Sequence, residues 1–242
     1  PRLSFRLLDI YNYVTVRLLM RQADGIAILE ENLRDYILDR DLWNRPIVVF
    51  PYELHECVNQ AETNQAETVK FVIPGAVQKR RKDFDLVLDA FEEVLTQTAK
   101  VELTLLGFGQ GDYAEQIFAR CRQIQRKGGS VTFYDDFVPV GEFQRVMQLS
   151  DCILAPIQIE FDIGSNREYY GISKATGSIF DMIRYGKPGI FPKRFHAPKE
   201  METGILRYED GRELVQIILE LLENTERMKM LQNEARNNAA KY

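Results

Sequence analysis

The sequence of 242 residues has only three cysteines and two histidines. The cysteines, Cys57, Cys121 and Cys152, are widely spaced and form no CxxC pair, which argues against a disulfide framework and against a zinc site. This cysteine usage fits a reducing compartment, so we expect a cytoplasmic protein without a metal. His55 and His196 belong to no Ser–His–Asp order, and a GxSxG elbow is absent, so nothing indicates a serine hydrolase.

Long apolar runs and a strong positive charge are also missing. No hydrophobic run approaches the ~20 residues that cross a bilayer. The formal net charge is −5, which disfavours broad contact with nucleic acid, and we expect no such partner. A Walker lysine loop is absent, which disfavours simple ATP hydrolysis. With 45% hydrophobic and 28% charged residues, the composition is nevertheless that of a globular protein with ample material for a core.

Short apolar runs and helical patterns alternate from residue 69 onward. The runs 69–73, 101–106, 131–134, 152–156 and 188–192 are predicted strands, followed by a short strand near 204–206. The helices are expected over 84–95, 112–126 and 141–149, in the segment that ends at Gly186, over 213–222 and from 226. This alternation predicts an α/β fold with a doubly wound parallel sheet covered on both faces. Ligands of such a sheet bind outside the carboxyl ends of the strands.

The first 52 residues differ from the rest. Helical patterns accompany two short apolar runs: 26–29, which we expect to be a buried strand, and 47–50, which we expect to be a second short strand. Two short strands and two helices are too little for an independent domain. Residues 53–68 are polar and lack periodicity, which is typical of a linker. The predicted organisation is a small N-terminal α/β remnant (1–52), a linker (53–68) and a Rossmann-like C-terminal domain (69–242).

One stretch, 171–188, combines a polar, glycine-containing loop with the start of a helix. The predicted helix carries Asp181 on its second turn and stops at Gly186, ahead of Pro188. Backbone N–H groups at a helix start lack partners within the helix, and the helix dipole is positive there. Such a start attracts anions, above all phosphate.

Side chains around that helix start strengthen the phosphate hypothesis. Lys174 adds a full positive charge, and Thr176 and Ser178 add hydroxyl donors on either side of Gly177. The alternative is an ordinary N-capped helix without a ligand. The sequence leaves both interpretations open at this point.

Other polar segments follow the predicted strands. After the first strand, the segment 74–82 ends in four cations that would suit a diphosphate, or would form a solvated basic loop. After the second strand, the glycines of 107–111 allow a ligand or a neighbouring loop to approach the backbone, or make a tight turn. The segment 135–139 could form a pocket rim, where its two aspartates would either bind a metal or, as we prefer, form a turn. The long polar and aromatic segment 158–171 is predicted to be a mobile loop over a site.

The order of these pieces resembles the carboxyl-terminal half of a GT-B glycosyltransferase of family 4 (glycosyl transferases group 1). The resemblance is carried by Ile73-Pro74-Gly75 with Lys82, Leu106-Gly107-Phe108-Gly109, Val131–Tyr134, Ala155-Pro156 and Asp181–Pro188. Residues 1–52 resemble the exit of that family's N-terminal domain. Because the chain also begins at Pro1 in a helical pattern, we expect that the first Rossmann half of a longer protein is missing.

The resemblance implies roles for individual residues. Lys82, with a neighbouring arginine, would pair with the diphosphate of a nucleotide sugar, and Asp181 would accept hydrogen bonds from the ribose hydroxyls. Backbone around Gly177 would hold phosphate, and backbone around Val138 would meet the base. The expected donor-binding residues are Gly75, Arg81, Lys82, Gly107, Gly109, Val138, Lys174, Thr176, Gly177, Ser178 and Asp181.

Two positions depart from the family pattern. Ala76 stands where the family has an arginine, and Ser173 stands where it has the first glutamate of a Glu-x7-Glu pair. The resemblance therefore assigns no catalytic residue. It leaves three interpretations, namely a glycosyltransferase, a sugar-nucleotide epimerase of the same fold, and a non-catalytic nucleotide-sugar-binding or scaffold protein.

The glycosyltransferase is the interpretation that we prefer. The resemblance implies a retaining enzyme of polysaccharide biosynthesis, without cofactor or obligatory metal. It would move a sugar from a nucleoside-diphosphate sugar to a saccharide or lipid-linked acceptor, in the cytoplasm or at the inner face of the membrane. The chain alone should be inactive, because half of the cleft is missing. The apolar first helix would pack on the absent domain, on this chain's own core or on another copy in a homo-oligomer.

Overall fold

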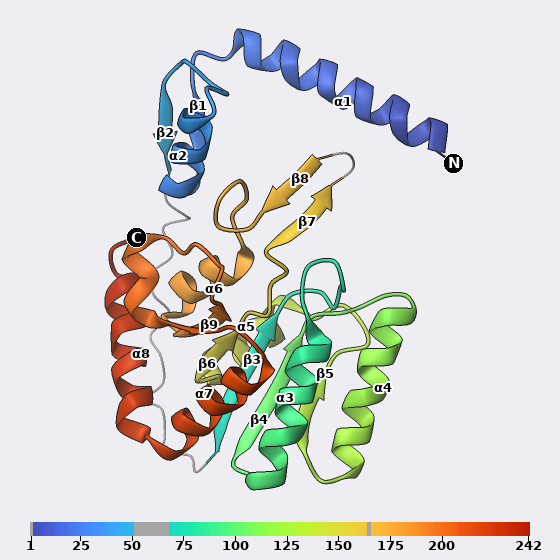
Figure 1. Cartoon of the computed structure of the whole chain (residues 1–242), viewed down its shortest axis with the longest axis vertical. Helices are drawn as coiled ribbons and strands as arrows, with labels where there is room; N and C mark the ends of the chain where they lie inside the picture. The colour runs from blue at the N-terminus through green and yellow to red at the C-terminus, as the bar shows by residue number, and fades with distance from the viewer. Residues whose placement is uncertain (1, 51–67, 164–165) are drawn as a thin grey trace.

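The computed structural model describes residues 2–50, 68–163 and 166–242 (Figure 1). Its centre is a six-stranded sheet in which all neighbours are parallel, in the order β10-β9-β6-β3-β4-β5. The prediction of a doubly wound parallel sheet is thus confirmed. The strands are β3 (Val69–Pro74), β4 (Val101–Leu106), β5 (Ser130–Phe133), β6 (Cys152–Leu154), β9 (Gly189–Pro192) and β10 (Ile205–Tyr208).

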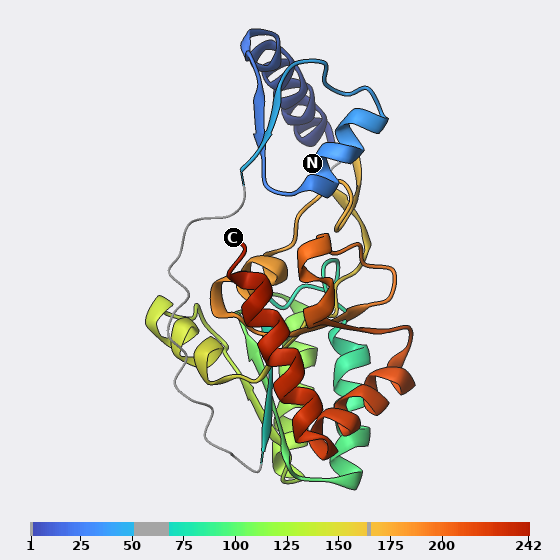
Figure 2. The ribbon, with the colours of Figure 1, turned by 90° about the vertical axis from the view of Figure 1, so that its left-hand side faces the viewer.

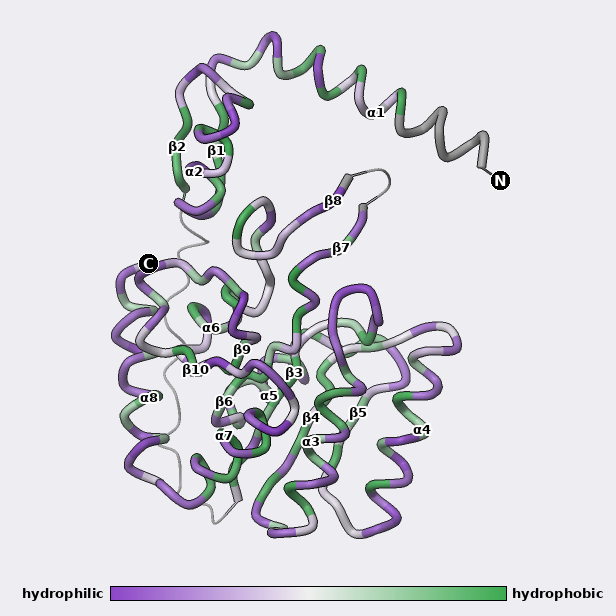
Figure 3. Tube along the Cα trace, in the orientation of Figure 1, coloured by the Kyte–Doolittle hydropathy of each residue, from purple (hydrophilic) through white to green (hydrophobic). Residues whose placement is uncertain are grey.

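Helices cover both faces of this sheet. Successive strand residues point to opposite faces, so Ile73 packs in one core cluster and its neighbour Val72 in the other. Figure 3 shows these strands as mostly hydrophobic, as expected for a sheet buried on both faces. One face is covered by α3 (Phe84–Gln97), α4 (Asp112–Arg126) and α7 (Gly211–Glu223), and the other by α5 (Val140–Leu149) and α6 (Gly177–Tyr185).

The last helix, α8 (Thr225–Ala239), closes the side of the domain. It runs along the sheet in Figure 2 and contacts α6, α7 and the 3₁₀ segment η1 (Lys199–Gly204). Buried Met228, Leu231 and Ala235 recur along it at spacings of three or four, which gives the helix one apolar face. None of the helices in the described parts of the chain combines the length and hydropathy needed to cross a membrane.

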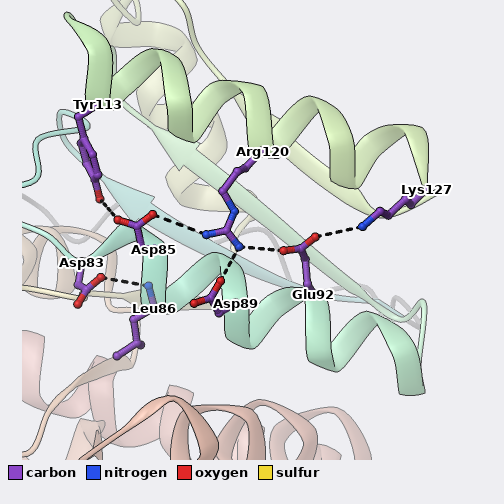
Figure 4. A network of polar contacts seen from close by, with 8 residues as sticks. All are labelled: Asp83, Asp85, Leu86, Asp89, Glu92, Tyr113, Arg120 and Lys127. Carbon is purple, nitrogen blue, oxygen red and sulfur yellow. Dashed lines mark hydrogen bonds and ion pairs between the residues drawn. The ribbon is translucent and has the colours of Figure 1, made fainter.

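A polar network joins α3 to α4 on the outside of the domain (Figure 4). Arg120 of α4 donates hydrogen bonds to Asp89 at 2.6 Å and to Glu92 at 2.8 Å, and lies 3.6 Å from Asp85. The Tyr113 hydroxyl donates to Asp85 at 3.1 Å. Because the Arg120 side chain is only 27% exposed and serves three acids, this network stabilises the pair of helices more than a single surface ion pair would.

The N-terminal part consists of α1 (Arg2–Gln22), β1 (Ile26–Ile28), α2 (Glu31–Asp39) and β2 (Ile47–Val49). The two strands pair in parallel and form a sheet of their own. The expectation of a buried strand at 26–29 is wrong, since Ala27 is exposed and Leu29 is 42% exposed. The reason is that α2 packs against this pair, and the alternate side chains face outward.

Helix α1 extends away from the sheet in Figure 1. Large apolar side chains lie along it in solvent, such as Tyr11, which is 67% exposed, and Leu19, which is 63% exposed. The predicted linker, 53–68, falls outside the described residues except for Thr68. The division into 1–52, 53–68 and 69–242 therefore stays a prediction.

The segment 158–171 is not the loop that we predicted. It contains an antiparallel hairpin of β7 (Glu160–Ile163) and β8 (Asn166–Tyr169). Charged side chains alternate with Phe161, which is buried and stacks on Tyr170 with ring centroids 4.5 Å apart. This burial of one side of β7 gives the polar segment a fixed strand conformation.

Candidate functional site

The strand order reverses between β3 and β6, which makes this the crevice where a doubly wound sheet binds its ligand. The loops that leave these two strands are tied together. The Asp83 N–H donates to the Pro156 carbonyl at 2.7 Å, and the Gln158 N–H donates to the Arg81 carbonyl at 2.8 Å. The loop after β3, with its cations, is thereby held over the ends of β3 and β6.

A polar pocket of about 220 Å³ lies in this crevice. Its lining comes from the loop after β3, Phe143 of α5, Ile157 after β6, Tyr170 after β8 and the start of α6. The structure brings seven of the predicted donor-binding residues together here, namely Gly75, Arg81, Lys82, Thr176, Gly177, Ser178 and Asp181.

Lys82 is the buried cation of the polar pocket. Its side chain is only 9% exposed, and its ammonium group donates a hydrogen bond to the Pro74 carbonyl. Burial lowers the pKa of Lys82 from 10.5 to about 8, whereas the charge of Asp181 raises it and that of Arg81 lowers it. Near neutral pH, Lys82 thus offers a poorly solvated positive charge to an anion in the pocket.

Asp181 faces Lys82 across the same pocket. Burial raises its pKa from 3.8 to about 7, and the charges of Lys82 and Arg184 act in the opposite direction. Lys82 and Asp181 therefore form a coupled pair in which both groups titrate near neutral pH. A bound anion would stabilise the charged lysine and the neutral acid.

The start of α6 opens into the polar pocket. The Thr176 hydroxyl accepts the Ser178 N–H at 3.4 Å and forms the N-cap, with both side chains buried. A Cβ atom at Gly177 would meet no atom within 4 Å, so the first turn is accessible on this side. Gly186 ends the helix with φ of 58°, as the sequence predicted.

An apolar pocket of about 320 Å³ adjoins the polar pocket, with which it shares Gly75, Ala76 and Phe143. Two more of the predicted residues, Gly107 and Val138, lie here. A Cβ atom at Gly107 would sit 2.4 Å from the Gly75 carbonyl oxygen, so only glycine permits this approach of the two loops. The other lining residues are Leu106, Phe108, Phe137, Val140, Gln144, Arg184 and Tyr185.

Two predicted residues lie outside both pockets. Lys174 closes the turn after β8, where its N–H donates to the Tyr169 carbonyl at 3.1 Å and its carbonyl accepts the Gly171 N–H at 2.8 Å. Gly109 pairs with Val77 and packs against Ala114. Each is held by the local backbone, so the structure does not bring Lys174 to the pocket with Lys82.

Several residues that line the pockets were not among the predicted site residues, and they include Phe143, Tyr170, Arg184 and Tyr185. Arg184 follows Asp181 by three residues, and this helical spacing was the signal that could have found it. Ser173, at the departure from the family pattern, accepts the Tyr169 N–H at 2.9 Å and donates to Glu168 at 2.6 Å. Within the described residues, no group of three or more His, Cys, Asp and Glu could hold a metal ion.

Solved structures of carbohydrate-active proteins resemble this chain. S. aureus TarM, as a mutant in complex with fondaparinux, α-GlcNAc-glycerol and UDP, is 14% identical over 92% of this chain and 41% of its own, with a TM-score of 0.65. HepE from Anabaena, in complex with UDP and glucose, is 17% identical over 95% of this chain and 62% of its own, with a TM-score of 0.60. The central domain has the fold of a GT-B domain.

A separately crystallised domain with the GT-B fold supports the comparison. The C-terminal domain of a glycosyl transferase group 1 family protein, LpcC from Francisella tularensis, is 10% identical over 76% of this chain and 95% of its own, with a TM-score of 0.57. No protein-family model and no curated protein sequence matches the chain. The chain spans 41% of TarM and 62% of HepE. At these identities, the likeness concerns the fold, and the resemblance inferred from the sequence is confirmed at that level.

Proposed function

We propose that this chain forms the donor-binding part of a retaining glycosyltransferase. The observation that carries the proposal is the polar pocket at the strand reversal, where buried Lys82 and the open start of α6 meet. A nucleoside-diphosphate sugar combines a diphosphate, which suits this pocket, with a flat base, which suits the adjoining apolar pocket. Two of the compared GT-B proteins, TarM and HepE, were crystallised with UDP, which supports this class of ligand.

In this proposal, the pocket stabilises the leaving group of the transfer. The bond between the anomeric carbon and the diphosphate oxygen breaks, and its electron pair stays on the diphosphate. The oxygen of the acceptor hydroxyl forms the new bond to the same carbon, and its proton passes to the leaving diphosphate oxygen. Lys82, Arg81 and the N–H groups at Gly177, which line this pocket, would stabilise the charge that develops on the diphosphate. Asp181 would accept hydrogen bonds from the ribose.

The proposal also covers the class of acceptor, the biosynthetic role and the cellular location. We propose a saccharide or lipid-linked acceptor, a role in polysaccharide biosynthesis, and a location in the cytoplasm or at the inner membrane face. The complex of TarM with α-GlcNAc-glycerol supports an acceptor of this kind. The donor-binding part alone is proposed to be inactive.

Calorimetric titration with UDP and GDP tests the donor site. We expect that at least one of them binds, and that Lys82→Met weakens its binding by at least about tenfold, because a buried charge contact is lost. Lys193→Met is the matched control, since Lys193 is 63% exposed and pairs with Glu209. Thermal unfolding followed by circular dichroism verifies that each variant is folded. Absence of binding by both nucleotides, or equal binding by Lys82→Met, would overturn the proposal.

A non-catalytic nucleotide-sugar-binding protein is the second candidate. Ser173 and Ala76 favour it, because they stand where the family carries an acid and an arginine toward the donor. Transfer of a labelled sugar to glycan or lipid-linked acceptors separates the candidates, if it is measured on the longest natural form of the protein. Binding without turnover would favour the second candidate. Assignment of the product's anomeric configuration by NMR tests retention.

A further inference from the structure

The apolar pocket has the chemistry of a site for a flat aromatic ring. The rings of Phe108 and Phe137 lie 6.4 Å apart at its edge, and Phe137 is 68% exposed. Aromatic faces stack on nucleic-acid bases of every kind, because each base has a π-face. Gly75 and Ala76 border both pockets, so a diphosphate in the polar pocket would place its attached nucleoside toward the apolar one. Stacking alone would not distinguish one base from another.

Two side chains bring polar atoms into this otherwise apolar lining, Gln144 and Arg184. The hydroxyl of Tyr185, which also lines the pocket, is itself buried in the protein. The guanidinium of Arg184 lies 5.7 Å from the centre of the Tyr185 ring. No hydrogen bond or ion pair joins Arg184 to any other residue in the described parts of the chain, so its N–H groups are available to a ligand.

The hydrogen-bonding chemistry of these two side chains differs in a way that matters for base selection. A guanidinium only donates, and it stays charged at every physiological pH. A side-chain amide both donates and accepts, so Gln144 can adapt to either kind of base edge. A base that presents an amino group to Arg184 would leave two donors facing each other. A base that presents a carbonyl oxygen would gain a charge-assisted hydrogen bond.

We infer that Arg184 makes the proposed donor site selective for bases with a carbonyl oxygen at pyrimidine C4 or purine C6 over bases with an amino group at that position. Uracil and guanine belong to the first class, and cytosine and adenine to the second. This inference rests on the proposed function, because it needs a nucleoside diphosphate in the two pockets. It adds the class of base and the residue that selects it.

A different role for Arg184 is testable in the same experiment. Arg184 lies one helical turn from Asp181, and its charge lowers the pKa of that acid. From this position it would also be able to bind the diphosphate, and would then strengthen binding of every nucleotide equally. The two roles predict different results, because only base selection changes the ratio of affinities between two nucleotides.

UDP and CDP are the decisive pair, since they share the ribose, the diphosphate and the ring size. We expect calorimetry at pH 7 to show that UDP binds at least about tenfold more tightly than CDP, and GDP similarly more tightly than ADP. Arg184→Gln, whose amide both donates and accepts, should bring UDP and CDP within about twofold of each other. Arg212→Gln, at an arginine that is 89% exposed, should keep the wild-type ratio.

Inorganic pyrophosphate completes the experiment. Its affinity should be unchanged in Arg184→Gln, because it has no base. Equal binding of UDP and CDP by the wild type would overturn the inference, as would a uniform loss of affinity in Arg184→Gln that includes pyrophosphate. If Arg184→Gln does not fold, Arg184→Met replaces it and should likewise bring UDP and CDP within about twofold of each other, because the donor is removed. If no nucleotide binds the wild type at all, the proposed function fails first, and that result is distinct from the others.

Discussion

Binding of a nucleoside-diphosphate sugar should weaken as the pH rises through about 8, the pKa to which burial lowers the ammonium of Lys82. A diphosphate beside this ammonium favours the charged form and moves the pKa back toward 10.5. The complex then keeps a proton that the empty site has lost, so the affinity falls with rising pH. Full restoration of the pKa corresponds to about 3 kcal/mol of binding free energy at high pH.

The change is large enough to measure within a moderate pH range. At pH 9, Lys82 in the empty site is about 90% neutral, so the affinity should be about tenfold lower than at pH 7. Asp181 acts in the same direction, because its pKa is raised to about 7 and its charged form repels the diphosphate. Both groups therefore predict tighter binding on the acidic side of this range.

Calorimetry with UDP-glucose at half-unit steps from pH 6.5 to pH 9 provides the assay, since the diphosphate of this ligand does not itself titrate there. Buffers with different ionisation enthalpies report the proton that is taken up on binding. Lys82→Met should bind weakly and show little dependence on pH above about 8, whereas Lys193→Met should follow the wild type. A dissociation constant that stays the same between pH 7 and pH 9 would refute the reasoning, as would an unchanged profile in Lys82→Met.

Three further predictions concern stability, each measured by urea unfolding. Arg120→Ala should lower the free energy of unfolding by about 1–2 kcal/mol because three acids lose their partner, whereas Lys127→Ala, at a side chain that is 75% exposed, should change it by less than about 0.5 kcal/mol. Gly171→Ala should lower the free energy of unfolding by more than about 2 kcal/mol. The reason is that φ is +80° and the new Cβ atom would sit 2.2 Å from the His196 carbonyl oxygen. Gly141→Ala, in α5 with no atom within 4 Å, should instead stabilise by up to about 1 kcal/mol. Gly186→Ala should lower the free energy of unfolding by about 1 kcal/mol, because the left-handed end of α6, with φ of 58°, favours glycine. An unchanged urea midpoint would contradict this prediction.

Apolar periodicity predicted the elements of the central domain well. The observed bounds of β4 and α4 are those read from the sequence, because each has a regular buried pattern between clear breaks. The hairpin of β7 and β8 was missed, although Phe161 alternates with Glu160 and Asp162. A short strand with charged residues on its outer side has too few apolar positions to be distinguished from a loop by pattern alone.

The sequence predicted those residues of the candidate site whose position follows from the ends of the strands. Lys82 and Thr176 follow the strand and hairpin ends that converge on the crevice, and they line the same pocket. The position of Lys174 was not predictable, because hydrogen bonds within its own turn set its direction. The pairing of Lys82 with Asp181 depends on how two loops fold over the sheet, which no local pattern contains. Arg184 was overlooked because a cation in the last turn of a helix usually serves the helix dipole.

The central sheet consists of two halves, β3-β4-β5 and β6-β9-β10, which are joined by a short strand pairing. Strands β3 and β6 pair at only two positions, Phe71 with Cys152 and Val72 with Ile153. A ligand bound in the crevice above this pairing would contact loops from both halves and would stabilise the two halves against separation. The amide protons of β4, on one side, and of β9, on the other, should then exchange with solvent at more nearly matched, slower rates once the crevice is filled.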